Sequence, residues 1–252
     1  METITRRLFS KQALSGLLTY SMLETVLASD AVAAEVTPII KKWLKQLNDL
    51  SQSVKDQKIT QLQWQSQVEV LFAQVSEDDF MQFIDFDKLA AQQKLVDHGA
   101  RSMRFSFPEV EGLPKQMVFG KQIFGLKKKR SVIPHGHNNM ATAFLILKGK
   151  LRGRHYDRLK DADDHLIIKP TINRTFKPGE YSTISDHKDN VHWFEAETEP
   201  AYIFNIHVLN VSPASKLPTG RVYVNPNGEQ LADGLIRAPR IGYKEANRLF
   251  GG

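Results

Sequence analysis

The sequence predicts a mainly β protein, a double-sheet jelly-roll barrel preceded by an α-helical N-terminal segment. Apolar residues recur at helical spacing from about residue 35 to residue 96. After Gly99 the pattern changes to short alternating runs that proline and glycine interrupt. Many short strands with regular turns are typical of a jelly roll or barrel. We therefore divide the chain into a leader over residues 1–33, a helical segment over 34–98 and a barrel with a C-terminal extension over 99–252.

The first residues resemble a bacterial twin-arginine export signal. Arg6 and Arg7 precede an apolar stretch over residues 13–28, and Ala31-Val32-Ala33 follows with small residues where a signal peptidase requires them. The alternative is an amphipathic N-terminal helix with two arginines that occur by chance. The order of the three features favours export. We expect a signal peptide over residues 1–33, recognition by the twin-arginine translocase, and a periplasmic or otherwise exported mature chain.

Composition excludes several kinds of site. The chain has 252 residues, a formal net charge of +6 and no cysteine, which excludes a disulfide framework, a thiolate metal site and a lipid-anchored cysteine. We expect no membrane-spanning segment beyond the leader. The dense basic run Lys127-Lys128-Lys129-Arg130 is more typical of a solvated loop or edge strand than of a nucleic-acid patch. An exported protein meets little nucleic acid, so we expect no nucleic-acid partner.

The helical segment contains two amphipathic stretches and a third helix start. Ser76-Glu77-Asp78-Asp79 resembles a capping box and predicts that a helix begins there. The aromatic residues of this region could form a ligand cage, but a helical core packed on the barrel is the commoner explanation. The apolar positions at helical spacing are Ile39, Ile40, Trp43, Leu44, Leu47, Leu50, Leu62, Trp64, Val68, Leu71, Phe72 and Val75.

The barrel strands are expected where apolar and polar residues alternate. Predicted strands lie at 103–107, 117–119, 143–147, 166–168, 202–209 and 221–224. Pro108, Pro114, Gly120, Pro170 and Pro178-Gly179 are expected to separate them. Asn225-Pro226-Asn227-Gly228 predicts a type I turn. A closing helix over Tyr243–Phe250 is expected to end at Gly251-Gly252 and to pack on the barrel.

Three histidines predict a metal site. His135 and His137 are two residues apart, so on a strand both point to the same face. His192 lies in a distant strand-like stretch and is the preferred third ligand, with His187 as its rival. Residues 138–142 contain no carboxylate, and Thr142 is expected near the site without being a strong ligand. Coordination by Glu180 or Glu195 would place the site in a different class.

The chain resembles the cupin superfamily, and within it the three-histidine thiol dioxygenases of the cysteamine dioxygenase and plant cysteine oxidase type. The resemblance covers residues 135–209. It rests on the His-x-His pair and on three stretches: Gly149-x-Leu151 followed by Tyr156-Asp157, Asn190-Val191-His192-x-Phe194-x-Ala196, and Pro200-Ala201-x-Ile203-Phe204. Lys177-Pro178-Gly179-Glu180-Tyr181 resembles the turn that opens the second motif of a cupin. The resemblance implies Fe(II) held by His135, His137 and His192, and oxidation of a small thiol or terminal cysteine to a sulfinate by O2.

Other metals and functions stay open at this point. Three neutral imidazoles suit Fe(II), but Zn, Mn or Ni is also possible. Export of a folded protein favours a metal that is loaded in the cytoplasm, such as Fe(II) or Mn(II). The alternatives to an oxygenase are a non-catalytic ligand- or metal-binding cupin of the cell envelope and a zinc or manganese cupin enzyme acting on a non-thiol substrate.

The sequence pattern assigns no catalytic residue, but it contains four candidates. Arg152, Arg154 or His155 could orient an anionic substrate, with His155 expected at the barrel mouth. His207 lies in the last predicted barrel strand, where some thiol dioxygenases have an outer-shell histidine. A buried histidine that is hydrogen-bonded for packing is an equally good explanation of His207.

Overall fold

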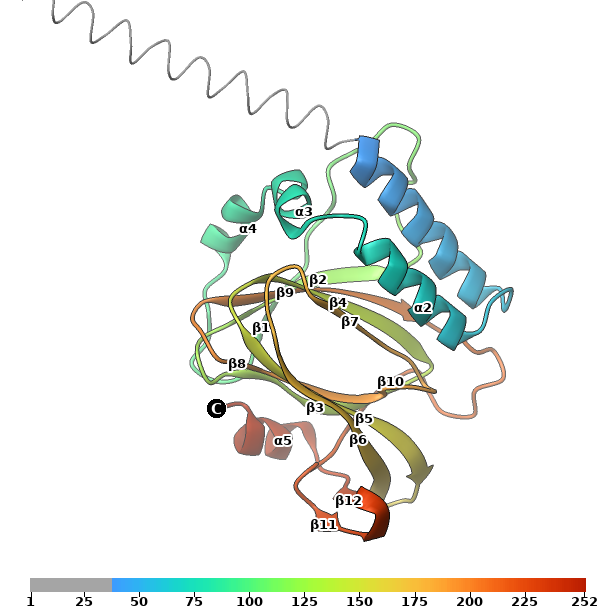
Figure 1. Ribbon diagram of the computed structural model, residues 1–252, viewed down its shortest axis with the longest axis vertical. Helices are drawn as coiled ribbons and strands as arrows, with labels where there is room; N and C mark the ends of the chain where they lie inside the picture. The colour runs from blue at the N-terminus through green and yellow to red at the C-terminus, as the bar shows by residue number, and fades with distance from the viewer. Residues whose placement is uncertain (1–37) are drawn as a thin grey trace, which may run out of the picture.

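The computed structural model describes residues 38–252, and the predicted signal peptide over residues 1–33 lies outside them. Two antiparallel sheets enclose the interior of a barrel, and helices cover one of them (Figure 1). The predicted fold class, a mainly β jelly roll preceded by a helical segment, is confirmed by the order of the strands within the two sheets.

The first sheet has five strands, all paired antiparallel. In spatial order they are β1 (Arg101–Met103), β2 (Gly120–Leu126), β9 (Ala201–Leu209), β4 (Met140–Lys148) and β7 (Tyr181–Ile184). The second sheet has seven strands, also antiparallel. In spatial order they are β10 (Gly220–Tyr223), β3 (Ser131–Asn138), β8 (Val191–Ala196), β5 (Leu151–Asp161), β6 (His165–Phe176), β12 (Ile236–Pro239) and β11 (Glu229–Gln230).

The eight strands β2 to β9 form the jelly roll. Their orders, β2-β9-β4-β7 in one sheet and β3-β8-β5-β6 in the other, place the chain alternately in the two sheets except at the β5–β6 hairpin. Two interlocked Greek keys of this kind close a barrel with one interior. Strands β10, β11 and β12 of the C-terminal extension then widen the second sheet at its two edges.

Within the described residues, four helices precede the barrel. They are residues 38–55, α2 (Gln61–Phe72), α3 (Glu77–Phe83) and α4 (Phe86–Gln92). The predicted start of α3 is confirmed, because the Ser76 side chain accepts a hydrogen bond from the backbone N–H of Asp79 at 3.1 Å. Thr60 and Gln63 form a complete capping box at the start of α2.

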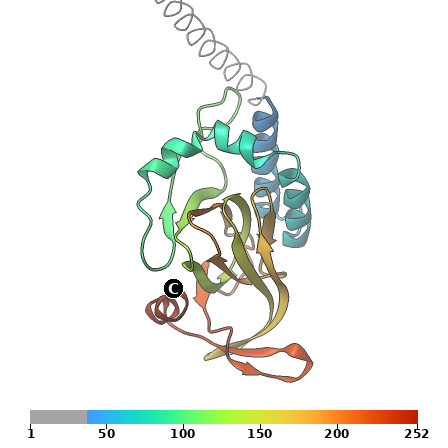
Figure 2. The same ribbon diagram turned by 60° about the vertical axis from the view of Figure 1, so that its left-hand side comes forward.

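The helices pack on the outer face of the first sheet (Figures 1 and 2). The aromatic residues of the helical segment belong to this packing layer, as expected for a core rather than a cage. Trp43, Trp64, Phe72 and Phe80 are all buried there, against Phe204 and its neighbours on β9 and β4. The first sheet is therefore buried on both faces, which explains the nearly continuous apolar runs of β4 and β9.

Two predicted strands are not formed as expected. The strand predicted at 103–107 ends at Met103, and residues 117–119 precede β2 instead of forming a strand. Phe105 and Phe107 leave the sheet, and their rings pack beside Phe204 at centroid distances of 6.2 and 6.3 Å. Here aromatic contacts with the helical layer replace pairing with a neighbouring strand. The alternation of apolar and polar residues over 103–107 therefore reflects burial of one side of the segment, without the hydrogen bonds of a sheet.

Pro170 does not separate two strands, contrary to the prediction. It lies inside β6, next to an irregular register where Tyr156 pairs with Pro170 and His155 pairs with Ile172. The neighbouring strand β12 reaches only as far as Ile168 on β6. Pro170 therefore lies beyond the end of β12, where β6 has only β5 as a neighbour. The missing backbone N–H of the proline disturbs the sheet little at this position.

The C-terminal region is as predicted. Residues 225–228 turn between β10 and β11, and α5 (Tyr243–Phe250) is the closing helix that ends at Gly251. Ala246 and Phe250 of α5 pack on Ile133, on the outer face of the second sheet, and the Phe250 ring lies 5.1 Å from that of Trp193.

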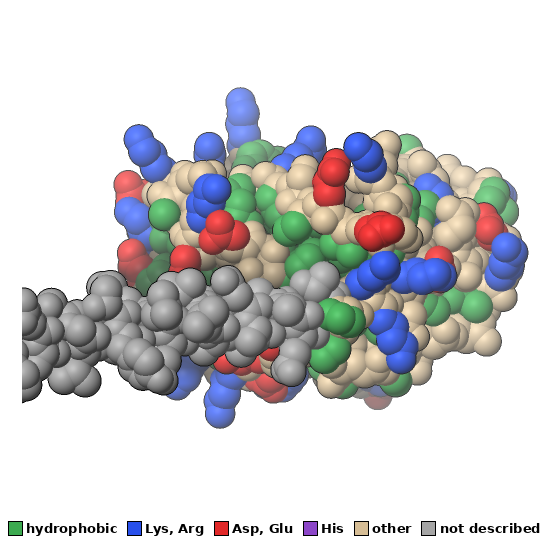
Figure 3. Space-filling view, turned by 90° about the horizontal axis from the view of Figure 1, so that it is seen from above, with side chains coloured by type: hydrophobic (Ala, Val, Ile, Leu, Met, Phe, Trp, Pro, Cys, Tyr) green, Lys and Arg blue, Asp and Glu red, His purple; other side chains and the backbone are tan. Residues whose placement is uncertain are grey.

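Charged side chains are spread over the surface. Viewed from the helical side, basic residues are scattered among acidic ones (Figure 3). The basic run over residues 127–130 forms the loop between β2 and β3, as expected, and Lys127 pairs with Asp97 at 2.6 Å. Among residues 38–252, no helix combines the length and the apolar character that crossing a membrane requires.

Candidate metal centre

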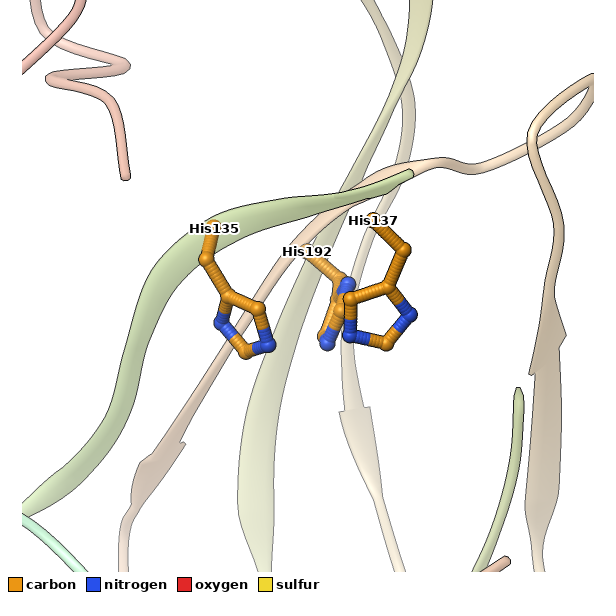
Figure 4. Close-up of side chains that lie close together, drawn as sticks. All are labelled: His135, His137 and His192. Carbon is orange, nitrogen blue, oxygen red and sulfur yellow. The ribbon is translucent and has the colours of Figure 1, made fainter. Parts of the chain in front are cut away.

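Three buried histidines of the second sheet meet inside the barrel. His135 and His137 lie on β3, and His192 lies on β8 directly opposite His135 in the strand pairing. The closest ring nitrogens of the three residues lie within 4.8 Å of one another. Figure 4 shows the three rings converging on one point. The structure thus brings together the three residues that the sequence singled out as ligands.

The backbone of β3 is shaped so that both of its histidines face inward. Gly136 stands between them on the opposite face, where an added Cβ would lie 2.6 Å from the Asn190 side chain. Asn190 uses this space: its side-chain amide donates to the carbonyl of His137 at 2.9 Å and to that of Ser185 at 2.9 Å. The His-Gly-His sequence therefore allows the loop before β8 to approach β3 closely.

The Nδ1 atom of each imidazole has a partner, which leaves Nε2 available. Nδ1–H of His135 donates to the carbonyl of Ile133 at 2.8 Å, and Nδ1–H of His192 donates to the carbonyl of Asn190 at 3.2 Å. The Nε2 atoms of His137 and His192 are buried and have no hydrogen-bond partner among the described residues. Metal-ligating histidines are usually held in this way, with one ring nitrogen hydrogen-bonded and the other free to ligate.

The His137 ring is contacted from the opposite sheet. Thr142, on the inner face of β4, places its hydroxyl 3.1 Å from Nδ1 of His137. Thr142 therefore lies near the site, as expected. The hydroxyl can hold the His137 ring in the orientation that points Nε2 at the other two histidines.

Burial keeps all three imidazoles uncharged. Burial first, and then the neighbouring histidines and Arg221, hold the pKa of His135 and His137 well below the usual value. Burial lowers the pKa of His192 to about 3. The three rings are therefore neutral near pH 7, the form in which a nitrogen lone pair can bind a metal.

The cavity beside the histidines is small and contains no acidic side chain. Its volume is about 10 Å³, roughly what one water molecule needs, and residues from both sheets line it. Besides the three histidines, the lining residues are Phe124, Val132, Met140, Thr142, Phe144, Asn205, His207 and Arg221. A carboxylate ligand is therefore absent from the lining of this cavity, and the apolar residues restrict the access of water.

His155 is not at the barrel mouth, contrary to the prediction. It is fully buried on β5, beside His192, and its ring lies between those of Phe176 and Phe194 at 6.0 and 5.3 Å. The Ser182 hydroxyl is 3.4 Å from each of its ring nitrogens. His155 does not line the cavity of the three histidines. The regular alternation of β5 turns it inward, next to the aromatic part of the interior.

Arg152 and Arg154, the other candidates for orienting a substrate, do not line the histidine cavity. These residues alternate with Leu151, Gly153 and His155, which face the interior, so they lie on the outer face of β5. Arg152 donates to the side chain of Asn173 at 2.7 Å. Arg154 pairs with Glu195 at 3.4 Å and stacks over the ring of Trp193 at 4.1 Å.

The rival ligands lie outside the cluster. His187 is exposed in the loop before β8 and is not among the converging residues. Glu180 pairs with Arg174 at 2.6 Å, and Glu195 is held on the outer face by Arg154. The site therefore remains a three-histidine site without a carboxylate.

The cavity is also lined by His207 on β9 and Arg221 on β10. His207 was a candidate from sequence, and it does line the cavity, in the space left by the missing side chain of Gly120. Arg221 was not recognised. A strand at 221–224 was predicted, but the sequence contains no signal that this strand pairs with β3 and sets Arg221 opposite His137.

The similarity of this chain to known proteins is low. No protein-family model and no curated protein matches the sequence. Among solved structures, the chain is similar to an oxalate oxidase in complex with glycolate, with 15% identity and a TM-score of 0.35 over 51% of this chain and 56% of that one. The match thus spans little more than half of that oxalate oxidase.

Two further solved structures come from bacteria. One is a cupin superfamily protein from Desulfitobacterium hafniense, with 14% identity and a TM-score of 0.32 over 48% of this chain and 87% of that one. The other is an uncharacterised protein with a double-stranded β-helix domain from Klebsiella pneumoniae, with 10% identity and a TM-score of 0.35 over 53% of this chain and 85% of that one. The assignment of the jelly roll rests on the strand order described above.

Proposed function

We propose that this chain is an exported, metal-dependent cupin, an Fe(II) oxygenase that converts a small thiol to a sulfinate. One observation carries the proposal: three neutral imidazoles converge inside a barrel, and the Nε2 atoms of His137 and His192 have no partner among residues 38–252. Buried polar atoms without a partner cost roughly 1–3 kcal/mol each. A divalent metal bound to the three Nε2 atoms would remove this cost.

The residues present fit a metal of the first transition series. Imidazole nitrogen suits iron, zinc, nickel and copper, and three such ligands leave coordination positions open. With Nε2 of each ring free to ligate, Nδ1–H donates to the Thr142 hydroxyl in His137, to the Ile133 carbonyl in His135 and to the Asn190 carbonyl in His192. These are the outer partners that metal-binding histidines require. His135, His137 and His192 would hold the ion.

The surroundings favour chemistry on an anionic sulfur. When bound, Fe(II) supplies a cation that stabilises a thiolate and can transfer electrons to O2. The overall reaction adds both atoms of O2 to the sulfur, so that R-SH and O2 become R-SO2H without another reductant. Phe124, Val132 and Phe144 restrict the access of water, and the narrow space beside the histidines favours a small thiol or the side chain of a terminal cysteine over a bulky substrate.

Oxygen consumption tests the proposed activity directly. Fe(II)-loaded mature protein is expected to consume O2 when it receives cysteine, cysteamine, a mercapto-acid or a peptide with N-terminal cysteine, with one sulfinate formed per O2. The same protein loaded with Zn(II) serves as control, because zinc has no redox chemistry. If the iron-loaded protein consumes no O2 with any of these thiols, the chain is a non-catalytic binding cupin or a zinc or manganese enzyme for another substrate.

Export is part of the proposal and has its own test. The sequence at Arg6-Arg7, the apolar stretch and Ala31-Val32-Ala33 support it. Changing both arginines to lysine keeps the charge but removes the guanidinium groups, so the precursor is expected to accumulate in the cytoplasm. Cell fractionation followed by N-terminal sequencing measures this. Normal export of the double variant, or a mature N-terminus far beyond Ala34, would contradict the proposal.

A further inference from the structure

We infer that the cavity between the loop over residues 104–119 and the helix over residues 38–55 binds an amphipathic carboxylate. The ammonium group of Lys121 holds the carboxylate, and the apolar walls of the cavity hold the hydrocarbon part of the ligand. This site is separate from the three histidines. It lies on the outer side of β2, whereas Phe124 of the same strand lines the histidine cavity.

The cavity has the size of a small-molecule site. Its volume is about 610 Å³, within the range of roughly 300–1,000 Å³ that is usual for ligand pockets. Leu44 of the helix is fully buried at its inner wall, and Phe107, Leu113 and Met117 of the loop are half-buried around it. These side chains offer an apolar surface to a hydrocarbon ligand.

The loop that forms one side of the cavity is held on the helical layer. Residues 104–119 contain neither a helix nor a strand, and ordered connections of this length often serve as binding loops. Near one end, the Phe107 ring packs beside Phe204 of β9. Near the other end, the backbone N–H of Val118 donates to the side-chain oxygen of Asn48 at 2.9 Å. The cavity is therefore formed before a ligand arrives.

Lys121 brings a charge into this apolar layer. On β2 it lies directly opposite Ile206, which is fully buried under the helices, and directly opposed residues point to the same face of a sheet. Its Nζ lies 4.6 Å from the ring centroid of Phe107 and 5.9 Å from that of Phe105.

The ammonium group of Lys121 has no negative partner among residues 38–252. Burial lowers the pKa of Lys121, and no carboxylate of the described residues counteracts this effect. The group has thus lost part of its hydration without gaining an ion pair, and a bound carboxylate would supply the missing partner.

The other charged residues of the lining do not reverse this preference. Glu109 and Lys115 pair with each other at 3.2 Å, and both are exposed to solvent, as is Glu111. Solvent screens these three charges, whereas Lys121 is half-buried against two phenylalanine rings. The charge of Lys121 therefore acts most strongly on a ligand inside the cavity, and it favours an anionic head group.

Calorimetric titration with three head groups on one hydrocarbon chain tests the inference. The whole chain is titrated with octanoate, octan-1-ol and octylammonium. We expect octanoate to bind roughly tenfold more tightly than octan-1-ol, in keeping with one partly exposed charge-assisted interaction, and octylammonium to bind most weakly. Lys121→Gln should remove the preference for octanoate and leave the affinity for octan-1-ol unchanged, which also shows that the variant is folded. Lys121→Arg should retain the preference.

The matched control is Lys148→Gln, which removes an exposed lysine from β4 of the same sheet and should leave all three affinities unchanged. Labelling of the wild type needs no substitution. Octanoate should slow the acetylation of Lys121 by acetic anhydride several-fold, as followed by peptide mass spectrometry, without slowing that of Lys148. Equal affinities for octanoate and octan-1-ol, an unchanged preference in Lys121→Gln, or no protection of Lys121 overturns the inference.

The same titration on metal-free and metal-loaded protein separates this site from the histidines. We expect equal affinities for octanoate in the two forms, because Lys121 and the histidine cavity lie on opposite sides of β2. Binding of octanoate that disappears when the metal is removed would place the carboxylate at the histidines and would also overturn the inference.

Discussion

Replacing His192 with alanine is expected to abolish stable metal binding. His192 is fully buried, lies opposite His135 on the neighbouring strand and supplies one of only three converging nitrogens. Loss of an outer hydrogen-bond partner alone typically lowers metal affinity about 10- to 100-fold, so loss of a ligand should lower it by more than about 100-fold. Metal content after dialysis, measured by mass spectrometry, and calorimetric titration with Fe(II) or Zn(II) quantify the effect.

The matched control is His187→Ala, five residues earlier in the chain. His187 is exposed and lies outside the cluster, so its replacement should leave the metal content unchanged. Circular dichroism and thermal unfolding of both metal-free variants show whether the barrel is intact. Retention of one metal per chain by a folded His192→Ala variant would refute the three-histidine site. If the His187→Ala variant lost the metal instead, His187 would be the third ligand.

Replacing Phe204 with alanine is expected to cost about 3–5 kcal/mol of the free energy of unfolding, as for other large aromatic residues removed from a core. Phe204 is fully buried on the outer face of β9, and its ring lies 4.5 Å from that of Phe80 in α3. Phe105 and Phe107 pack on it from the loop after β1. The substitution therefore opens a cavity where the helical segment meets the barrel. Urea denaturation followed by tryptophan fluorescence measures the loss.

Val70→Ala is the control for this measurement. Val70 lies on α2 with 61% of its surface exposed, so its truncation should change the stability by less than about 0.5 kcal/mol. If Phe204→Ala lost less than about 1 kcal/mol, the helices and the first sheet would not share one core. A loss of the expected size confined to one of two separate unfolding transitions would likewise show that the helical segment unfolds independently of the barrel.

Local signals in the sequence were sufficient to predict several elements of the structure. The start of α3 at Ser76 and the whole of α5 were predicted, because capping residues and helical periodicity act within one or two turns. The jelly-roll class was predicted from many short strands with regular turns. The inward orientation of His135 and His137 also follows from local geometry, since residues two apart on a strand share a face.

Other elements could not be placed from local signals. Residues 117–119 have the composition of a strand but lie outside the sheets, while β6 continues through Pro170. Whether a segment joins a sheet depends on whether a neighbouring strand offers its backbone groups, and that neighbour is far away in the sequence. At Pro170, β12 ends before the missing N–H would matter.

The sequence by itself determined the three histidines, the absence of a carboxylate from residues 138–142 after His137, and the class of barrel that holds the site. Only the tertiary structure decided which other residues reach the site. Arg152 and Arg154 follow the histidine motif in the sequence, but alternation on β5 turns them outward. Arg221, 84 positions after His137, turns inward because β10 pairs with β3 in the register that opposes these two residues. Strand pairing and barrel closure are long-range properties, and a change of register by one residue would have reversed both outcomes.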